Sequence, residues 1–149
     1  MFTICRAAIM AATLSLAFAM PAIAQDAWPM ESGDYVEVSG IEIDDGHELE
    51  YAQFLASSGK RTQEFAKAQG WITGYEVLTN ENARKGEPDL YLVVRFANFV
   101  DKAEEEKRAK AYRAVAARTI TQLQAESAGR ANYRHGAGTM LLRQQTFKN

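Results

Sequence analysis

Seven aromatic, basic and histidine side chains have the types that a binding site for a small molecule needs. Aromatic walls with one or two cations suit a planar ligand that is anionic or phenolic. The candidates are Tyr35, Trp71, Tyr75, Tyr91, Arg95, His135 and Arg143. A structural interpretation stays open, because aromatic side chains pack in ordinary sheets and an arginine of a sheet often pairs with an acid such as Glu37. The set predicts a site for a small aromatic or anionic ligand, and no catalytic residue is identified.

Two metal-binding patterns are partly present around His47. The run His47-Glu48-Leu49-Glu50-Tyr51 is similar to the zinc-protease motif H-E-x-x-H, but Tyr51 stands where the second histidine is required. Asp44, His47 and Glu50 offer oxygen and nitrogen ligands, although acids in the first turn of a helix are also favoured by the helix dipole. We expect no metal and no cofactor.

Phosphate-loop and hydrolase motifs are also incomplete. Gly59-Lys60-Arg61-Thr62 has Phe54 where a phosphate loop has its first glycine, and it lies inside a helical pattern. The chain has two histidines, His47 and His135, and no serine in a nucleophile-elbow context. Hydrolysis by a classical triad is therefore not expected, and His135 alone is typical of a solvated loop.

The first 24 residues have the pattern of a signal peptide. Residues 1–6 carry one cation, residues 7–20 are apolar and uncharged, and Pro21-Ala22-Ile23-Ala24 provides a helix break and a small-x-small cleavage site. A membrane anchor is the alternative, but the apolar stretch is shorter than the roughly 20 residues of a spanning helix. We predict cleavage after Ala24, a periplasmic protein and no membrane span after cleavage.

Removal of the signal leaves 125 of the 149 residues, without Cys5, the only cysteine of the chain. Disulfides, thiolate metal sites and a cysteine nucleophile are then excluded together. Loss of Arg6 changes the formal net charge from −2 to −3, which is too near neutral to predict nucleic-acid binding. With 47% hydrophobic and 24% charged residues, the composition is that of one folded domain.

The first half of this domain is predicted to form a strand, a helix and a hairpin. After a polar lead-in at 25–34, residues 35–43 are rich in β-branched side chains and predict a strand. A helix is expected over 46–69, with Asp45 and Glu48 as a capping pair, a bend or interruption at 57–59, and Gly70 as the stop. Residues 71–78 and 89–96 predict two strands of a hairpin.

The second half predicts one helix and one strand. Asp101 and Glu104 form a second capping pair, and the helix that follows is expected to fray near Gly129. Its apolar stripe is Tyr112, Val115, Ala116, Thr119, Ile120 and Leu123. A last strand over 139–147 completes the order β-α-β-β-α-β, which predicts a ferredoxin-like α+β domain over 35–147 with two helices on one face of the sheet. Because both faces of the 89–96 strand are substantially apolar, a second copy is expected to cover the other face.

The strand over 35–43 that runs into the turn Asp44-Asp45-Gly46-His47-Glu48, together with the hairpin entry at 71–76, resembles the dimeric α/β-barrel superfamily. This superfamily includes antibiotic-biosynthesis-type monooxygenases and stress-responsive barrel proteins. The resemblance covers roughly residues 35–147. It implies a homodimer and, in the enzymatic branches, a pocket between the helices and the sheet of each subunit.

Three functional hypotheses follow from these patterns. The first is a small-molecule binding or accessory protein without catalysis. The alternative is a cofactor-independent or haem-handling monooxygenase that uses the neighbourhood of Trp71 and Tyr75, which requires a tryptophan, an amide and a histidine to converge. The third is a structural protein of the cell envelope whose acidic helix at 104–106 contacts a partner, although such charge runs are usually solvated faces.

Overall fold

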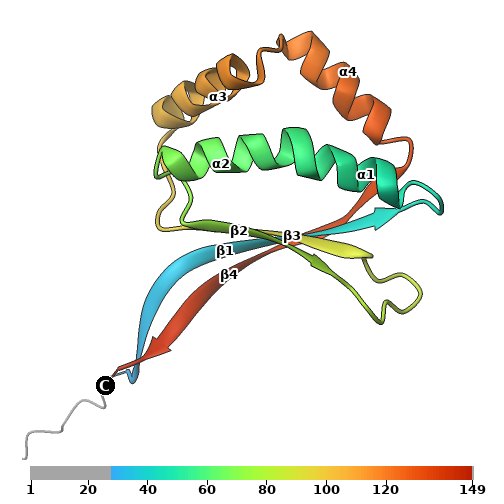
Figure 1. Ribbon diagram of the computed structural model, residues 1–149. Helices are drawn as coiled ribbons and strands as arrows, with labels where there is room; N and C mark the ends of the chain where they lie inside the picture. Colours follow the sequence, from blue (N-terminus) through green and yellow to red (C-terminus); the bar gives the residue numbers. More distant parts are fainter. Residues whose placement is uncertain (1–27, 149) are drawn as a thin grey trace, which may run out of the picture.

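The fold is a four-stranded antiparallel sheet with helices on one side (Figure 1). The computed structural model describes residues 28–148, so the predicted signal peptide and Cys5 lie outside the described residues. The strand order in the sheet is β2-β3-β1-β4. The elements are β1 (Met30–Ile43), α1 (Glu48–Phe54), the π-helical η1 (Leu55–Gly59), α2 (Lys60–Ala68), β2 (Gly74–Thr79), β3 (Leu90–Phe96), α3 (Lys102–Ala116), α4 (Ile120–Arg130) and β4 (Arg134–Phe147).

The first and last strands of the chain, β1 and β4, are longer than predicted. β1 begins at Met30, inside the expected lead-in, because residues 30–32 pair with the end of β4, where Met30 lies opposite Phe147. β4 begins at Arg134, ahead of the predicted start at 139, and passes through Gly138 at a φ of 100° beside a register shift. Main-chain pairing and a bulge with a glycine extend a strand where the side-chain pattern gives no signal.

The first helical segment runs from Glu48 to Ala68 without a gap, but its middle is a π-helical turn. The bend or interruption predicted at 57–59 is confirmed in the sense that η1, at Leu55–Gly59, interrupts the α-helical hydrogen bonding. Gly70, at a φ of 70°, ends the segment as predicted. The predicted Asp45 cap is wrong: His47 is the N-cap residue and no side chain caps the helix, because residues 44–46 form a turn with Gly46 at a φ of 88°.

The second helical segment is two helices, so the observed order β-α-β-β-α-α-β differs from the predicted β-α-β-β-α-β. The Asp101 cap is confirmed, with its carboxylate accepting a hydrogen bond of 2.9 Å from the Glu104 amide. The helix then stops at Ala117, which has a φ of 51°, and Thr119 starts α4 with a capping box that includes Gln122. A Thr-x-x-Gln box satisfies two amides at a helix start, which favours a new helix here over continuation.

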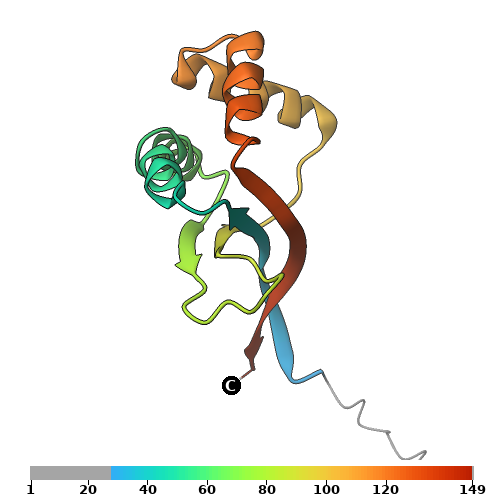
Figure 2. The same cartoon turned by 90° about the vertical axis from the view of Figure 1, so that its right-hand side faces the viewer.

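The buried core lies where α1 and η1 cover the sheet. Ile41, Leu90 and Tyr133 pack there against Tyr51, whose side chain is 1% exposed. In contrast, α3 and α4 contain no buried residue and stand farther from the sheet than α1 and α2 (Figures 1 and 2). The helix layer therefore covers the sheet incompletely.

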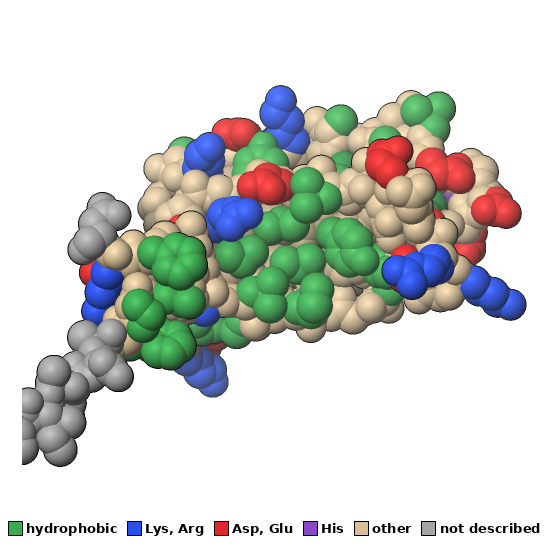
Figure 3. Space-filling model, turned by 90° about the horizontal axis from the view of Figure 1, so that it is seen from below, with side chains coloured by type: hydrophobic (Ala, Val, Ile, Leu, Met, Phe, Trp, Pro, Cys, Tyr) green, Lys and Arg blue, Asp and Glu red, His purple; other side chains and the backbone are tan. Residues whose placement is uncertain are grey.

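The other side of the sheet, which we call the far face, carries no helix in the described residues (Figure 1). Hydrophobic side chains gather across this face (Figure 3), and they come from all four strands. They include Val36, Val38, Leu78, Tyr91, Val93, Met140 and Leu142. Apolar patches of this kind are typical of surfaces that another molecule covers.

Candidate functional site

A cavity of about 660 Å³ lies between the first helical segment, the sheet and the α3–α4 pair. Its wall at the sheet includes Val77 of β2 and Leu92 of β3, and α4 contributes Leu123. The cavity exists because α3 and α4 stand away from the sheet (Figure 2), so their apolar stripe does not fill the space beneath them. The predicted stripe residues Ala116 and Leu123 line the cavity instead of a closed core.

The π-helical turn η1 forms one wall of this cavity, through Leu55, Ser58 and Gly59. Two hydroxyls bond to carbonyl oxygens around the turn: Ser57 donates to the Gln53 oxygen at 2.6 Å, and Thr62 donates to the Ser58 oxygen at 2.9 Å. Such hydroxyls compete with the helical hydrogen-bond ladder. Single π-helical turns inside α-helices occur frequently at functional sites.

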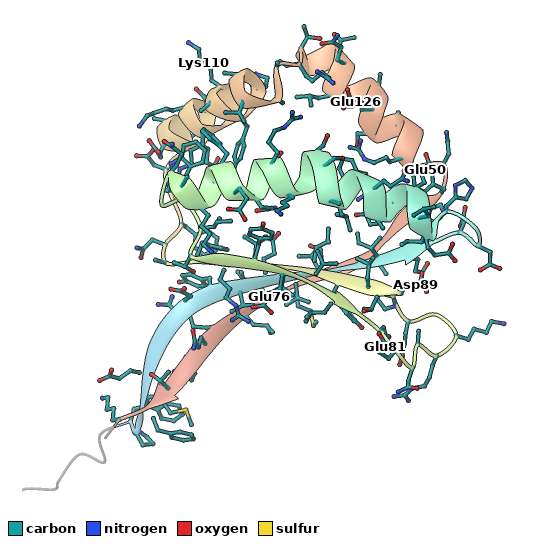
Figure 4. All side chains as sticks on the ribbon, viewed as in Figure 1. Glu50, Glu76, Glu81, Asp89, Lys110 and Glu126 are labelled. Atoms are coloured by element: carbon teal, nitrogen blue, oxygen red, sulfur yellow. The ribbon has the colours of Figure 1, made fainter. Side chains whose placement is uncertain are left out.

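The lining of the cavity is apolar with a cationic excess. Four cationic side chains line it, against two carboxylates, Glu76 and Glu126. Both carboxylates already have partners: Glu126 accepts from Arg118 at 2.9 Å, and Glu76 lies 3.4 Å from Arg95. Glu126 lies on α4 and Glu76 on β2, with the segment from α1 to α2 between these two elements in Figure 4.

Arg130 and Tyr75 are two further polar lining groups held by specific contacts. The Arg130 guanidinium lies 4.0 Å from the centre of the Phe54 ring, an arrangement that orients the cation. The Tyr75 hydroxyl donates a hydrogen bond of 2.5 Å to the Glu64 carboxylate, and this bond, with desolvation and the Glu64 charge, raises the pKa of Tyr75. Tyr75 is therefore a neutral hydroxyl at physiological pH.

A smaller cavity of about 290 Å³ surrounds Trp71. Trp71 meets Phe65 and Tyr112 edge-on, with ring centres 5.3 and 5.2 Å apart, and Arg108 lies 5.1 Å from its ring centre. The lining includes the amide side chains Gln63 and Asn98. The aromatic packing is that of a local core, with Arg108 as its cover.

The histidines lie at another end of the molecule, where β1 leaves the sheet. His135 lies 3.0 Å from Asp44, while His47 lies 3.0 Å from Glu50 and stacks on Tyr133 with ring centres 4.8 Å apart. Of the three groups that the oxygenase alternative requires, only tryptophan and amide meet at Trp71. In the part of the chain that the structure describes, no group of three or more histidine, cysteine or acidic side chains is placed to hold a metal ion.

The seven residues predicted as ligand contacts fall into separate places. Tyr75 lines the large cavity and Trp71 the small one. Tyr91, Arg95 and Arg143 line a shallow groove on the far face. Arg143 also lies over the ring of Tyr35, 4.0 Å from its centre, and His135 lies apart from all of these.

Sequence reasoning missed the groups that define the large cavity at its α4 side. The sequence pattern places Leu123 on the apolar stripe of a single helix and gives Arg118 and Arg130 no role. The available signal was the Thr119 capping box, which separates α3 from α4 and places Arg118 in the turn between them. The other signal was the interruption at Ser57-Ser58-Gly59, because π-helical turns inside α-helices occur frequently at functional sites.

No protein-family model matches this chain, and no curated protein matches it. The fold and the cavity therefore carry the functional argument. Within residues 28–148, none of the helices combines the length and the apolar character that crossing a bilayer requires.

Proposed function

We propose that this protein is an exported homodimer that binds a small molecule in the cavity beside η1. The observation that carries the proposal is the cavity itself. Its volume of about 660 Å³ lies within the range of known ligand sites. Its walls are mainly apolar, and a few polar groups, among them Tyr75 and Arg130, are available to orient a ligand.

The dimer in this proposal forms through the far face of the sheet, as the resemblance to dimeric α/β barrels implies. Leu78, Met140 and Leu142 are 48%, 51% and 49% exposed on this face. Two copies packed sheet to sheet would remove these side chains from water, which is favourable in proportion to the apolar area buried.

Export to the periplasm is part of the same proposal. It is supported by the apolar segment and the small-residue site in residues 1–24. The absence of any cysteine after Cys5 agrees with a protein that relies on packing and association for its stability.

The cavity is tested with N-phenylnaphthylamine, a neutral dye whose fluorescence rises in apolar sites. Val77 and Leu78 are neighbours on β2 with similar exposure, 49% and 48%, but they lie on opposite sides of the sheet. Val77→Trp places a large side chain inside the cavity, and Leu78→Trp adds the same side chain to the far face. We expect Val77→Trp to weaken dye binding at least about tenfold and Leu78→Trp to change it by less than about twofold.

Two results would contradict the cavity as the binding site. One is that the native protein binds neither this dye nor its anionic counterpart, anilinonaphthalenesulfonate. The other is equal weakening by both tryptophan variants, which would place the dye outside the cavity. Circular dichroism of both variants checks that the fold is retained.

A further inference from the structure

The charge of the large cavity is opposite to that of the protein. The whole chain has a formal net charge of −2, yet Lys60, Arg61, Arg118 and Arg130 line the cavity against two carboxylates. Those two carboxylates are held by arginines, Glu126 by Arg118 and Glu76 by Arg95. The excess of positive charge is therefore concentrated where the walls are otherwise apolar.

Three of the lining cations have no acid of their own. Across residues 28–148, Lys60, Arg61 and Arg130 have no carboxylate within 4.0 Å. Lys60 and Arg61 are exposed, whereas Arg130 is half-buried and its guanidinium is fixed above the Phe54 ring at 4.0 Å. An oriented guanidinium is suited to a planar anion such as a carboxylate, which it binds through two parallel hydrogen bonds.

We infer that the cavity takes an amphipathic organic anion, with its charged group at Arg130 and its apolar body against Leu55, Val77 and Leu92. This inference rests on the proposed function and names the chemical class of its ligand. The aliphatic walls contact the apolar body of the ligand, and the unpaired guanidinium of Arg130 at the end of α4 binds its charged group. A neutral apolar molecule of the same shape would leave Arg130 without a partner.

Two dyes that share one aromatic body separate these contributions. Anilinonaphthalenesulfonate carries a sulfonate, and N-phenylnaphthylamine is the same body without it. Both are titrated by fluorescence into the native protein, into Arg130→Gln and into Lys110→Gln. Lys110 is an exposed residue of α3 outside the cavity lining (Figure 4), so Lys110→Gln is a control for the loss of one positive charge.

We expect the native protein to bind the anionic dye at least about tenfold more tightly than the neutral dye. Arg130→Gln should remove most of that preference and leave the affinity for the neutral dye within about twofold. Lys110→Gln should leave both affinities near the native values. Retained binding of the neutral dye also reports that the cavity of Arg130→Gln is intact. If Arg130→Gln fails to fold, the test is made with Arg130→Lys and with the salt dependence of anionic-dye binding by the native protein.

The inference fails if the native protein binds both dyes equally, or if Arg130→Gln and Lys110→Gln weaken the anionic dye alike. In those cases the cavity remains a binding site and only the ligand class is wrong. If Val77→Trp leaves the binding of both dyes unchanged, or neither dye binds, the proposed function itself fails. The two failures are therefore distinguishable.

Discussion

Replacing Leu142 by glutamate is the most direct perturbation of the proposed dimer. Leu142 lies on the far face opposite Val36 in the sheet register, and it is 49% exposed. Its neighbour Leu141 lies opposite Glu37 on the helix-facing side, and it is 52% exposed. The two leucines share strand, residue type and exposure and differ in the face they occupy, so Leu141→Glu is a matched control.

The magnitude follows from the exposed half of Leu142. Complete burial of a leucine side chain contributes about 1.5–3 kcal/mol, so burial of the remaining half contributes roughly 0.7–1.5 kcal/mol. A symmetric interface contains this residue twice, which gives about 1.5–3 kcal/mol for the dimer. Loss of that contribution weakens association about 10- to 100-fold, and burial of two carboxylates weakens it further.

Sedimentation equilibrium at micromolar concentration measures this effect. We expect a dimer for the native chain and for Leu141→Glu, and a monomer with unchanged circular dichroism for Leu142→Glu. A native chain that is monomeric at these concentrations would refute the sheet-to-sheet dimer. Equal dissociation constants for the two variants would show that the copies associate through another surface.

Two further predictions concern single contacts. Thr119→Ala removes the capping box of α4 and should cost about 1 kcal/mol locally, seen as roughly fivefold faster amide exchange in α4, while Gln124→Ala within the same helix has little effect. Glu64→Ala removes the carboxylate that accepts the Tyr75 hydrogen bond, together with its charge, so an NMR titration should show the pKa of Tyr75 falling towards its ordinary value of 10.0. Because that pKa is raised in the folded chain, its contribution to stability is fully present below about pH 10 and is lost as the pH rises through the folded pKa, a loss that Glu64→Ala should reduce.

The sequence predicted those elements whose side chains repeat with a clear period. The hairpin strands and the start of α3 were found because alternating apolar residues and the Asp101 cap are local signals. The break before α4 was missed because the Thr119 box lies within a stripe of apolar residues that continues across it. The starts of β1 and β4 were missed because their pairing depends on main-chain contacts between residues more than 90 positions apart.

The candidate site was less predictable than the fold because it depends on how layers are spaced. The sequence grouped Tyr75 with Tyr91 by residue type, but strand register places them on opposite sides of the sheet. The cavity itself arises from the distance between α4 and the sheet, and no periodic pattern encodes that distance. The role of Arg130 in the cavity depends on the position of its guanidinium over the Phe54 ring, and that position follows from where α4 lies.

The long pairing of β1 with β4 determines where the protein can be tethered to another molecule and how the order of its elements along the chain can be changed. Beyond the end of β3 the two strands continue as a ribbon that extends away from the helices (Figure 1), and the Lys148 amide donates to the Pro29 carbonyl at 2.9 Å at its tip. A tether or label joined at either position starts from one point, away from the cavity. A short peptide could link the two positions into a ring, and new ends opened in the loop between β2 and β3 would give a circular permutant with the same sheet.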